Sequence, residues 1–366
     1  MNVDIKNKKI KNFINVWQDK KNPKKDINKK NYPDPTEFKK YNNKEELISL
    51  LKNIQKNLTP EKKEKTFDCI ICRQKNISTC FYETEKFVWE DSLIHYIEKH
   101  DIEIPEKFLD YIFYGKIPKM TLLSRFKKDN LYYYVKLKRN QIMIMDALMY
   151  HGGYDKKYKS SGNDYKYSEH MGLLDFDKKN LESFIISAKT SRIDKNDDDI
   201  FLPKGLENEY EYEYIFHTHP PTPKPGGRVT MGILYEFPST SDIFHFIEHF
   251  NEGKTIGSIV ITPEGMYNIR KKDFDKIKLD INENSLFKEY HKELFNQQDL
   301  AIKKFGKNIT TSKFYSKVSQ DITYIENINK VLNKYEMHID FYPRKKDSKG
   351  KWIIDDVYLK ILYNNY

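Results

Sequence analysis

Apolar residues recur along the chain at both helical and strand-like spacings, a pattern typical of a mixed α/β protein. Leu47, Leu50, Leu51 and Ile54 lie three and four residues apart and predict a helix over 45–57. Short apolar runs predict strands at 132–138, 169–174, 183–189, 211–217, 257–262 and 266–270. Longer periodic segments predict helices at 105–113, 141–150, 241–251, 285–305 and 311–335.

Changes in composition divide the chain into four regions. Residues 1–43 are rich in Lys and Asn and are interrupted by prolines, which predicts a disordered basic arm. Residues 44–115 contain the first helix and all three cysteines, and residues 131–272 form the alternating α/β body. Residues 273–366 predict two helices and then a hairpin over 337–362 that turns at 347–350.

Charge is distributed unevenly over these regions. The 366 residues include 64 Lys and Arg and 54 Asp and Glu, for a net charge of +10. Residues 1–65 alone hold 18 lysines and nine acidic residues, so they account for +9 of it. The arm therefore has three interpretations, namely a solvated tail, a nucleic-acid contact through phosphate neutralisation, or a contact with an acidic partner.

Several classes of protein are excluded by composition. No apolar run reaches the roughly 18 residues of a membrane span, and the first eleven residues carry charge without a following apolar segment, so we expect neither membrane insertion nor secretion. Three cysteines are too few for a disulfide scaffold. We expect an intracellular protein, cytoplasmic or nuclear.

The densest candidate chemistry lies around His217. Residues two apart on a strand point to the same face, so His217 and His219 are expected to present both imidazoles to one metal ion. Ser239 or Thr240 is a favourable N-cap, which would place Asp242 in the first turn of the following helix. Two histidines and one carboxylate leave the fourth position of a tetrahedral zinc open, as in catalytic sites.

A hydrolytic zinc site also needs a proton carrier. The best upstream candidate is Glu169, at the start of an apolar strand, and Ser239 offers a hydroxyl for a developing oxyanion.

Together these residues resemble the pattern of the JAMM/MPN+ (JAB domain) zinc metalloproteases. The matching residues are Glu169 in Glu-His-Met-Gly-Leu-Leu, His217 and His219 in His-Thr-His-Pro, and Ser239 with Asp242 in Ser-Thr-Ser-Asp. The resemblance implies an MPN-like mixed sheet flanked by helices over about residues 131–272.

The resemblance also implies roles for these residues and a class of substrate. Glu169 would be the general base, His217, His219 and Asp242 the zinc ligands, and Ser239 the oxyanion stabiliser. The substrate would be an isopeptide bond to ubiquitin or a ubiquitin-like protein. The segment 220–238 is longer than the family pattern and is expected to loop out beside the metal, where it could form a lid over the substrate.

A second metal-binding pattern precedes the body. Cys69 and Cys72 are followed by His95 and His100, the spacing Cys-x2-Cys-x22-His-x4-His, which predicts a structural zinc site. The pattern resembles a C2H2 zinc finger with a longer central gap, and Cys80 within that gap could replace a ligand. The alternative is a pair of buried cysteines with unrelated histidines.

The pattern as a whole favours a zinc-dependent isopeptidase or peptidase with an N-terminal zinc-finger-like module and a C-terminal helical and hairpin region. The alternative is a non-catalytic zinc-finger adaptor that binds nucleic acid or protein, with the MPN-like region as a scaffold.

Overall fold

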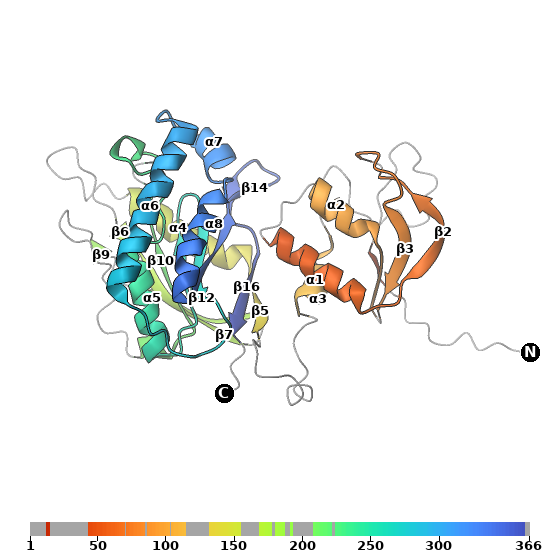
Figure 1. Cartoon of the computed structure of the whole chain (residues 1–366), viewed down its shortest axis with the longest axis horizontal. Coiled ribbons are helices and arrows are strands. Elements are labelled where there is room, and N and C mark those ends of the chain that lie inside the picture. The colour runs from red at the N-terminus through yellow and green to blue at the C-terminus, as the bar shows by residue number, and fades with distance from the viewer. Residues whose placement is uncertain are drawn as a thin grey trace, which may run out of the picture. The chain divides into compact units, whose positions relative to one another are not determined.

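The computed structural model describes residues 12–14, 43–69, 71–84, 86–102, 104–114, 132–154, 168–177, 180–186, 191–192, 208–221 and 224–362. The chain divides into two compact units, Met1–Pro118 and Lys119–Tyr366, and Figure 1 labels most of their elements. Helices and a large mixed sheet confirm the predicted mixed α/β class. None of the described helices is both long enough and apolar enough to span a bilayer.

Among the described residues, the first unit is a small sheet with three helices. Its strands lie in the order β1-β4-β3-β2. The elements are β1 (Asn12–Ile14), α1 (Lys44–Lys56), β2 (Glu61–Phe67), β3 (Ser78–Glu83), β4 (Phe87–Glu90), α2 (Ser92–His100) and α3 (Glu106–Tyr114). Helix α1 packs on α2 and α3, and the rings of Trp89 and Phe108 lie 5.2 Å apart in the core. This unit therefore has its own hydrophobic core.

Part of the predicted disordered arm is ordered. Asn12–Ile14 pairs in parallel with Phe87–Trp89 of β4, so this short piece completes the edge of the small sheet. Apart from these three residues and Asn43, the arm predicted over 1–43 lies outside the described residues.

The second unit is built on an eight-stranded mixed sheet. Strands β10–β11 and β5–β8 are parallel, and the other neighbours are antiparallel. From one edge to the other the strands are β13 (Met337–Pro343), β12 (Gly265–Lys271), β11 (Gly257–Ile261), β10 (Tyr214–Thr218), β7 (Met171–Asp177), β8 (Asn180–Ile186), β5 (Tyr132–Leu137) and β16 (Val357–Leu362).

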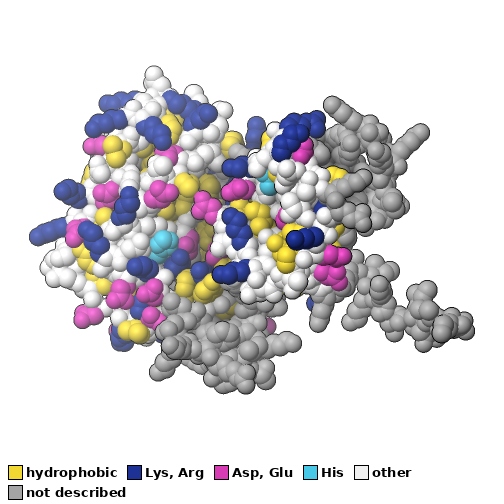
Figure 2. All heavy atoms as spheres, turned by 45° about the vertical axis from the view of Figure 1, so that its right-hand side comes forward, with side chains coloured by type: hydrophobic (Ala, Val, Ile, Leu, Met, Phe, Trp, Pro, Cys, Tyr) yellow, Lys and Arg dark blue, Asp and Glu magenta, His cyan; other side chains and the backbone are white. Residues whose placement is uncertain are grey.

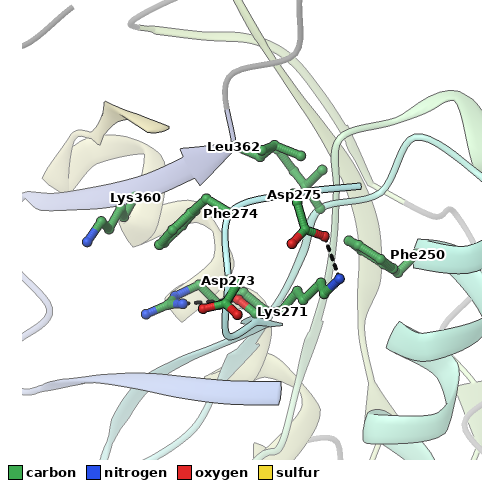
Figure 3. A pocket seen from close by; sticks show the side chains of 9 residues that line it. Phe250, Lys271, Asp273, Phe274, Asp275, Lys360 and Leu362 are labelled. Atoms are coloured by element: carbon green, nitrogen blue, oxygen red, sulfur yellow. Dashed lines mark hydrogen bonds and ion pairs between the residues drawn. The ribbon is translucent and has the colours of Figure 1, made fainter. Parts of the chain in front are cut away.

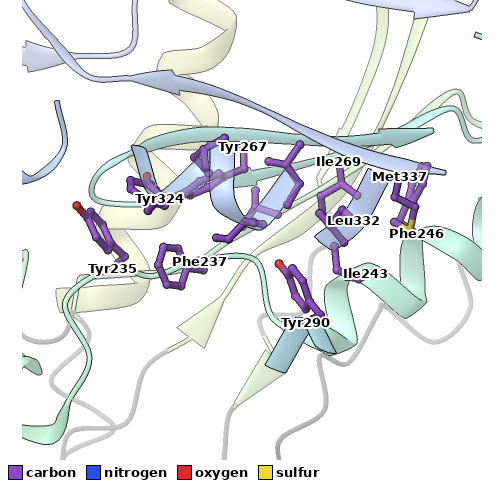
Figure 4. Packing of buried hydrophobic residues seen from close by; sticks show 14 of the residues in the cluster. Tyr235, Phe237, Ile243, Phe246, Tyr267, Ile269, Tyr290, Tyr324, Leu332 and Met337 are labelled. Carbon is purple, nitrogen blue, oxygen red and sulfur yellow. Dashed lines mark hydrogen bonds between the residues drawn. The ribbon is translucent and has the colours of Figure 1, made fainter. Parts of the chain in front are cut away.

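Helices cover this sheet and enclose its main core. Helix α4 (Arg139–Tyr154) packs on β10 and β11, and α5 (Thr240–Glu252) packs on β11 and β12. Helix α6 (Glu283–Phe305) packs on α5 and on α8 (Thr323–Leu332), and α8 covers β13. Figure 4 shows the cluster between the strands and α5, with Tyr267 and Ile269 from the sheet facing Ile243 and Phe246 from the helix.

The region predicted to be separate, 273–366, belongs to this same compact unit. Strand β13 pairs with β12, and β16 pairs with β5, so this region supplies the strands at both edges of the large sheet. The hairpin predicted over 337–362 is accordingly much shorter. Only β14 (Lys345–Lys346) and β15 (Trp352–Ile353) pair with each other across the 347–350 turn, where Gly350 has a φ of +80°.

The helix predicted over 311–335 is interrupted. A short helical segment over 311–318 ends before α8 begins at Thr323. The carboxylate of Asp321 accepts hydrogen bonds from both the backbone N–H and the hydroxyl of Thr323. Asp321 thus satisfies one free N–H of the first turn of α8, whose N-cap is Ile322, and the apolar periodicity alone missed this break.

A buried carboxyl in the β11–β12 turn makes stability depend on pH. Burial and the nearby Glu236 raise the pKa of Glu264 to about 7, although the hydroxyl of Tyr267 donates to it at 2.9 Å. The folded state therefore binds a proton that the unfolded state releases between pH 4.5 and 7, so this group lowers stability as the pH rises through that window. We expect the free energy of unfolding of Glu264→Gln, measured by denaturant titration, to exceed that of the wild type by about 2–3 kcal/mol at pH 8. Near pH 4 the two free energies should be similar. The exposed Glu326→Gln is the control, and an equal gain at both pH values would contradict the assignment.

Candidate metal centre

The two histidines of the His-x-His motif lie at the end of the central strand β10. His217 pairs with Met171 of β7 on one side and with Val260 of β11 on the other. The backbone N–H of His219 donates to Ile261 at 2.8 Å, which extends the alignment with β11 beyond the end of β10. The Nε2 atoms of the two imidazoles lie 3.1 Å apart, so the predicted common orientation is present.

A glycine allows the neighbouring strand to lie close to this position. A Cβ atom at Gly172 of β7 would lie 2.1 Å from the carbonyl oxygen of Ile185 and 2.3 Å from the ring of Phe216. Any larger side chain would push these strands apart. The glycine of the Glu-His-Met-Gly segment is thus required for the tight packing of β7 beside His217.

Asp242 reaches the histidines from the first turn of α5. Ser239 is the N-cap, and its hydroxyl oxygen accepts from the backbone N–H of Asp242 while its own N–H donates to Oδ2 of Asp242. Oδ1 lies 3.1 Å from Nε2 of His217, and Oδ2 lies 3.4 Å from Nε2 of His219. The capping box thus holds the carboxylate against the end of β10.

The geometry of these three side chains fits a metal ion. A tetrahedral ion with bonds of about 2.0–2.1 Å separates its ligand atoms by roughly 3.3 Å. The two imidazole Nε2 atoms lie 3.1 Å apart, and each lies 3.1–3.4 Å from one of the two carboxylate oxygens of Asp242. Oδ1 of Asp242 is buried and accepts no hydrogen bond from any group that the structure describes. His217, His219 and Asp242 could therefore hold a metal ion together.

Glu169 lies at the edge of this group. It ends the short strand β6 (Ser168–Glu169), which pairs with β9 (Ser191–Arg192), and the N–H of the next residue, His170, donates to the hydroxyl of Thr218 at 3.0 Å. Oε1 of Glu169 lies 3.9 Å from Nε2 of His219, and Oε2 is buried without a hydrogen-bond partner among the described groups. Burial raises the pKa of Glu169, although the two histidines oppose this.

The group is organised to hold positive charge. Burial disfavours the imidazolium of His219, but the carboxylates of Glu169 and Asp242 outweigh it and raise the pKa of His219 to about 10. Burial likewise disfavours the carboxylate of Asp242, yet His217 and His219 keep its pKa well below the usual range. The negative potential that would hold a proton here would also attract a metal cation.

The long insert is packed against the body. All of 220–238 except residues 222 and 223 is described, and Leu234, Tyr235 and Phe237 are buried in the main core cluster. The carbonyl oxygen of Glu236 lies 3.2 Å from Nδ1 of His219. The insert thus lies beside the histidines as expected, but its second half is fixed. The contact of Glu236 with His219 has no signature in the sequence.

The first unit brings together the other predicted group. Sγ of Cys69 lies 3.2 Å from Nε2 of His100, and Sγ of Cys72 lies 3.5 Å from Nε2 of His95. All four ligand atoms lie within 4.8 Å of one another. Bonds of about 2.3 Å to sulfur and 2.0–2.1 Å to nitrogen would separate tetrahedral sulfur and nitrogen ligands by roughly 3.6 Å. These side chains could therefore also hold a metal ion.

The topology around this second group accounts for its spacing. Cys69 and Cys72 lie in the turn between β2 and β3, where the N–H of Arg73 donates to the carbonyl oxygen of Cys69. Both histidines lie on α2, and strand β4 occupies part of the long interval between the cysteines and the helix. Cys80, on β3, is not a member of any metal-ligand group found among the described residues.

A shallow pocket at a different place in the second unit does not involve either group. Figure 3 shows its lining, where Lys271 forms an ion pair with Asp275 between the rings of Phe274 and Phe250. Arg270 is paired with Asp340, so the cations drawn there already have partners. The pocket gives no indication of chemistry.

Comparisons with known proteins yield one informative match. No family model matches the chain, and no solved structure matches it. Over 307 residues the chain is 32% identical to "Uncharacterized protein R413" of Acanthamoeba polyphaga mimivirus, a match that covers 80% of this chain and 84% of the viral protein.

The two groups predict the metal content of the protein. We expect the chain purified with zinc to hold two equivalents and the variants His219→Ala and Cys72→Ser to hold one each, because each change removes a ligand from a different group. Metal analysis of the folded proteins measures this. The control variant is His291→Ala, which changes an exposed histidine and should keep both ions. Two equivalents in His219→Ala would rule out the second-unit group as a metal centre.

Proposed function

We propose that this chain, which belongs to the same family as the mimivirus protein R413, is a zinc-dependent hydrolase of amide bonds. One observation carries the proposal. A buried carboxylate, Glu169, lies 3.9 Å from a histidine that forms one compact group with a second histidine and an aspartate. This arrangement combines a metal-ligand set with a proton carrier, the two parts that a hydrolytic metal site needs.

The types of side chain in this metal-ligand group favour zinc. Two imidazoles and one carboxylate suit zinc and leave one position open, as in catalytic zinc sites. Bound zinc would supply a Lewis acid and would lower the pKa of a water molecule from 15.7 to about 7. His217, His219 and Asp242 would hold the ion and keep it at the end of β10.

The remaining residues would handle protons and charge. Glu169 would take the proton from the attacking water and pass it to the leaving amine, and its burial raises its pKa. Ser239 accepts a hydrogen bond from Asp242 through its oxygen, so its hydroxyl hydrogen remains for the developing oxyanion. The β10–α5 junction holds Ser239 in place, and Glu169 reaches the same group from the end of β6.

The match to the JAMM/MPN+ pattern supports the reaction class and the substrate class. Glu169, His217, His219, Ser239 and Asp242 follow its order. We therefore propose an MPN-like second unit that acts on isopeptide bonds to ubiquitin or a ubiquitin-like protein. The spacing of Cys69, Cys72, His95 and His100 supports a structural zinc in a zinc-finger-like first unit.

The removal of the carboxylate tests the mechanism. We expect Glu169→Gln to lower the turnover of an isopeptide-linked ubiquitin substrate by about 10²–10⁴-fold because the proton carrier is lost. Zinc content should be unchanged, and chelation should abolish the activity of the wild type. Glu182→Gln, an exposed glutamate on β8, is the matched control and should retain full activity. Cleavage that survives both Glu169→Gln and chelation would eliminate the proposed mechanism.

A binding adaptor is the second candidate, and the charge of the arm favours it. Residues 1–65 carry +9, whereas on the face that Figure 2 shows, Lys and Arg side chains are interspersed with Asp and Glu. Because residues 66–366 together carry only about +1, we assign any contact with nucleic acid to the arm.

Salt dependence tests this candidate. If the arm binds nucleic acid, retardation of RNA or DNA by the full chain should weaken steeply between about 50 and 200 mM salt, because counterions are released on binding. Deletion of residues 1–42 should remove the retardation, whereas Lys349→Glu in the second unit should not. Retardation that is independent of salt, or that the deletion leaves intact, would exclude the arm as the binding element.

A further inference from the structure

Two side chains of helix α6 bind the backbone of the insert, one before Glu236 and one after it. Oε1 of Gln298 accepts hydrogen bonds from the N–H groups of Leu234 and Tyr235 at 2.9 and 3.0 Å, and Nε2 of Gln298 donates to the carbonyl oxygen of Tyr235 at 2.8 Å. Farther along the insert, the hydroxyl of Tyr290 donates to the carbonyl oxygen of Pro238 at 2.9 Å. The backbone is therefore fixed immediately before and shortly after Glu236.

These hydrogen bonds lie in the protein interior. Tyr290 is fully buried, and only 8% of Gln298 is exposed. Water does not compete for buried bonds of this kind, and breaking them leaves backbone groups unsatisfied. Gln298 thus fixes the conformation of the segment more firmly than an exposed contact would.

The fixed carbonyl selects one tautomer of His219. The carbonyl oxygen of Glu236 faces Nδ1 of that ring at 3.2 Å. A carbonyl can only accept, so the contact requires a proton on Nδ1, and in the neutral ring that binds a metal the lone pair is then on Nε2. Nε2 is the atom that lies beside His217 and Asp242. Partners of this kind orient metal-binding imidazoles and raise metal affinity.

We propose that Gln298 is a positioning residue of the metal centre. By holding residues 234–235, it keeps the carbonyl of Glu236 against Nδ1 of His219 and directs Nε2 toward the ion. The proposal rests on the metal-binding part of the proposed function. It assigns to the insert a role in metal affinity and geometry, and it makes α6 a part of the site.

The affinity of the full chain for metal tests this role. Zinc and cobalt(II) would be titrated against a chelating indicator, and the cobalt spectrum would report ligand geometry, with thiolate charge transfer marking the Cys69 centre. We expect Gln298→Met to weaken binding at the His219 centre by about 10–100-fold and to alter its cobalt spectrum, with the Cys69 centre unchanged.

The adjacent glutamine provides a matched control. Gln297 lies on the same helix and is 4% exposed, but its amide donates to Glu293 at 2.6 Å and no described hydrogen bond joins it to the insert. Gln297→Met should therefore leave both metal affinities within about twofold of the wild type. An equal loss in both variants would show general destabilisation of α6 and would overturn the proposal.

The remaining outcomes separate the two proposals. A folded Gln298→Met protein with wild-type affinity and spectrum overturns the positioning role alone. A wild type that binds no metal at His217, His219 and Asp242 overturns the proposed function as well. If Gln298→Met does not fold, Tyr290→Phe decides, because it removes only one hydroxyl. Several-fold weaker binding supports the role, and unchanged binding overturns it.

Discussion

The carboxylate of Asp242 has to satisfy two demands at once. The start of α5 needs an acceptor for the free N–H of Ser239, and the two imidazoles at the end of β10 need a negative partner. The two oxygens of one side chain meet both needs because the helix begins where the strand ends. A helix that began even one residue later would turn the carboxylate away from His217. The position of the helix start and the geometry of the metal group are therefore one constraint.

The rest of the second unit maintains that junction. Helix α5 is held by the core that α6 and α8 form with β11 and β12, and the insert adds buried side chains to the same core. The segment from His219 to Ser239 is thus anchored along its second half as well as at its ends. The carboxylate of Glu236, which is not among the metal ligands, is neutralised by its ion pair with Arg228. The region after residue 272 supports the site directly through these contacts.

The sequence allowed local features of the fold and the site to be predicted, but not distant contacts. His217 and His219 follow from strand alternation, and the place of Asp242 follows from the capping preference of Ser239, because both rules act within a few residues. The pairs Cys69–Cys72 and His95–His100 were readable for the same reason, because each pair lies within a few residues. The pairing of β16 with β5 and the contact of Gln298 with Tyr235 join residues more than 60 positions apart. No periodicity encodes such contacts, so the 337–362 hairpin was overextended and the role of α6 was missed.

The pairing of β16 with β5 also affects how the chain can fold during synthesis. Tyr132–Leu137 enters the sheet early in the chain, but its antiparallel partner, Val357–Leu362, follows more than 200 residues later. Until that partner has left the ribosome, β5 presents an open edge to other chains, and closing so long a loop is slow. The first unit has its own core, so it can fold before β16 pairs with β5. The nascent chain thus passes through a stage in which a folded leading unit is attached to an unfinished sheet, and this stage is where we expect chaperones to be needed most.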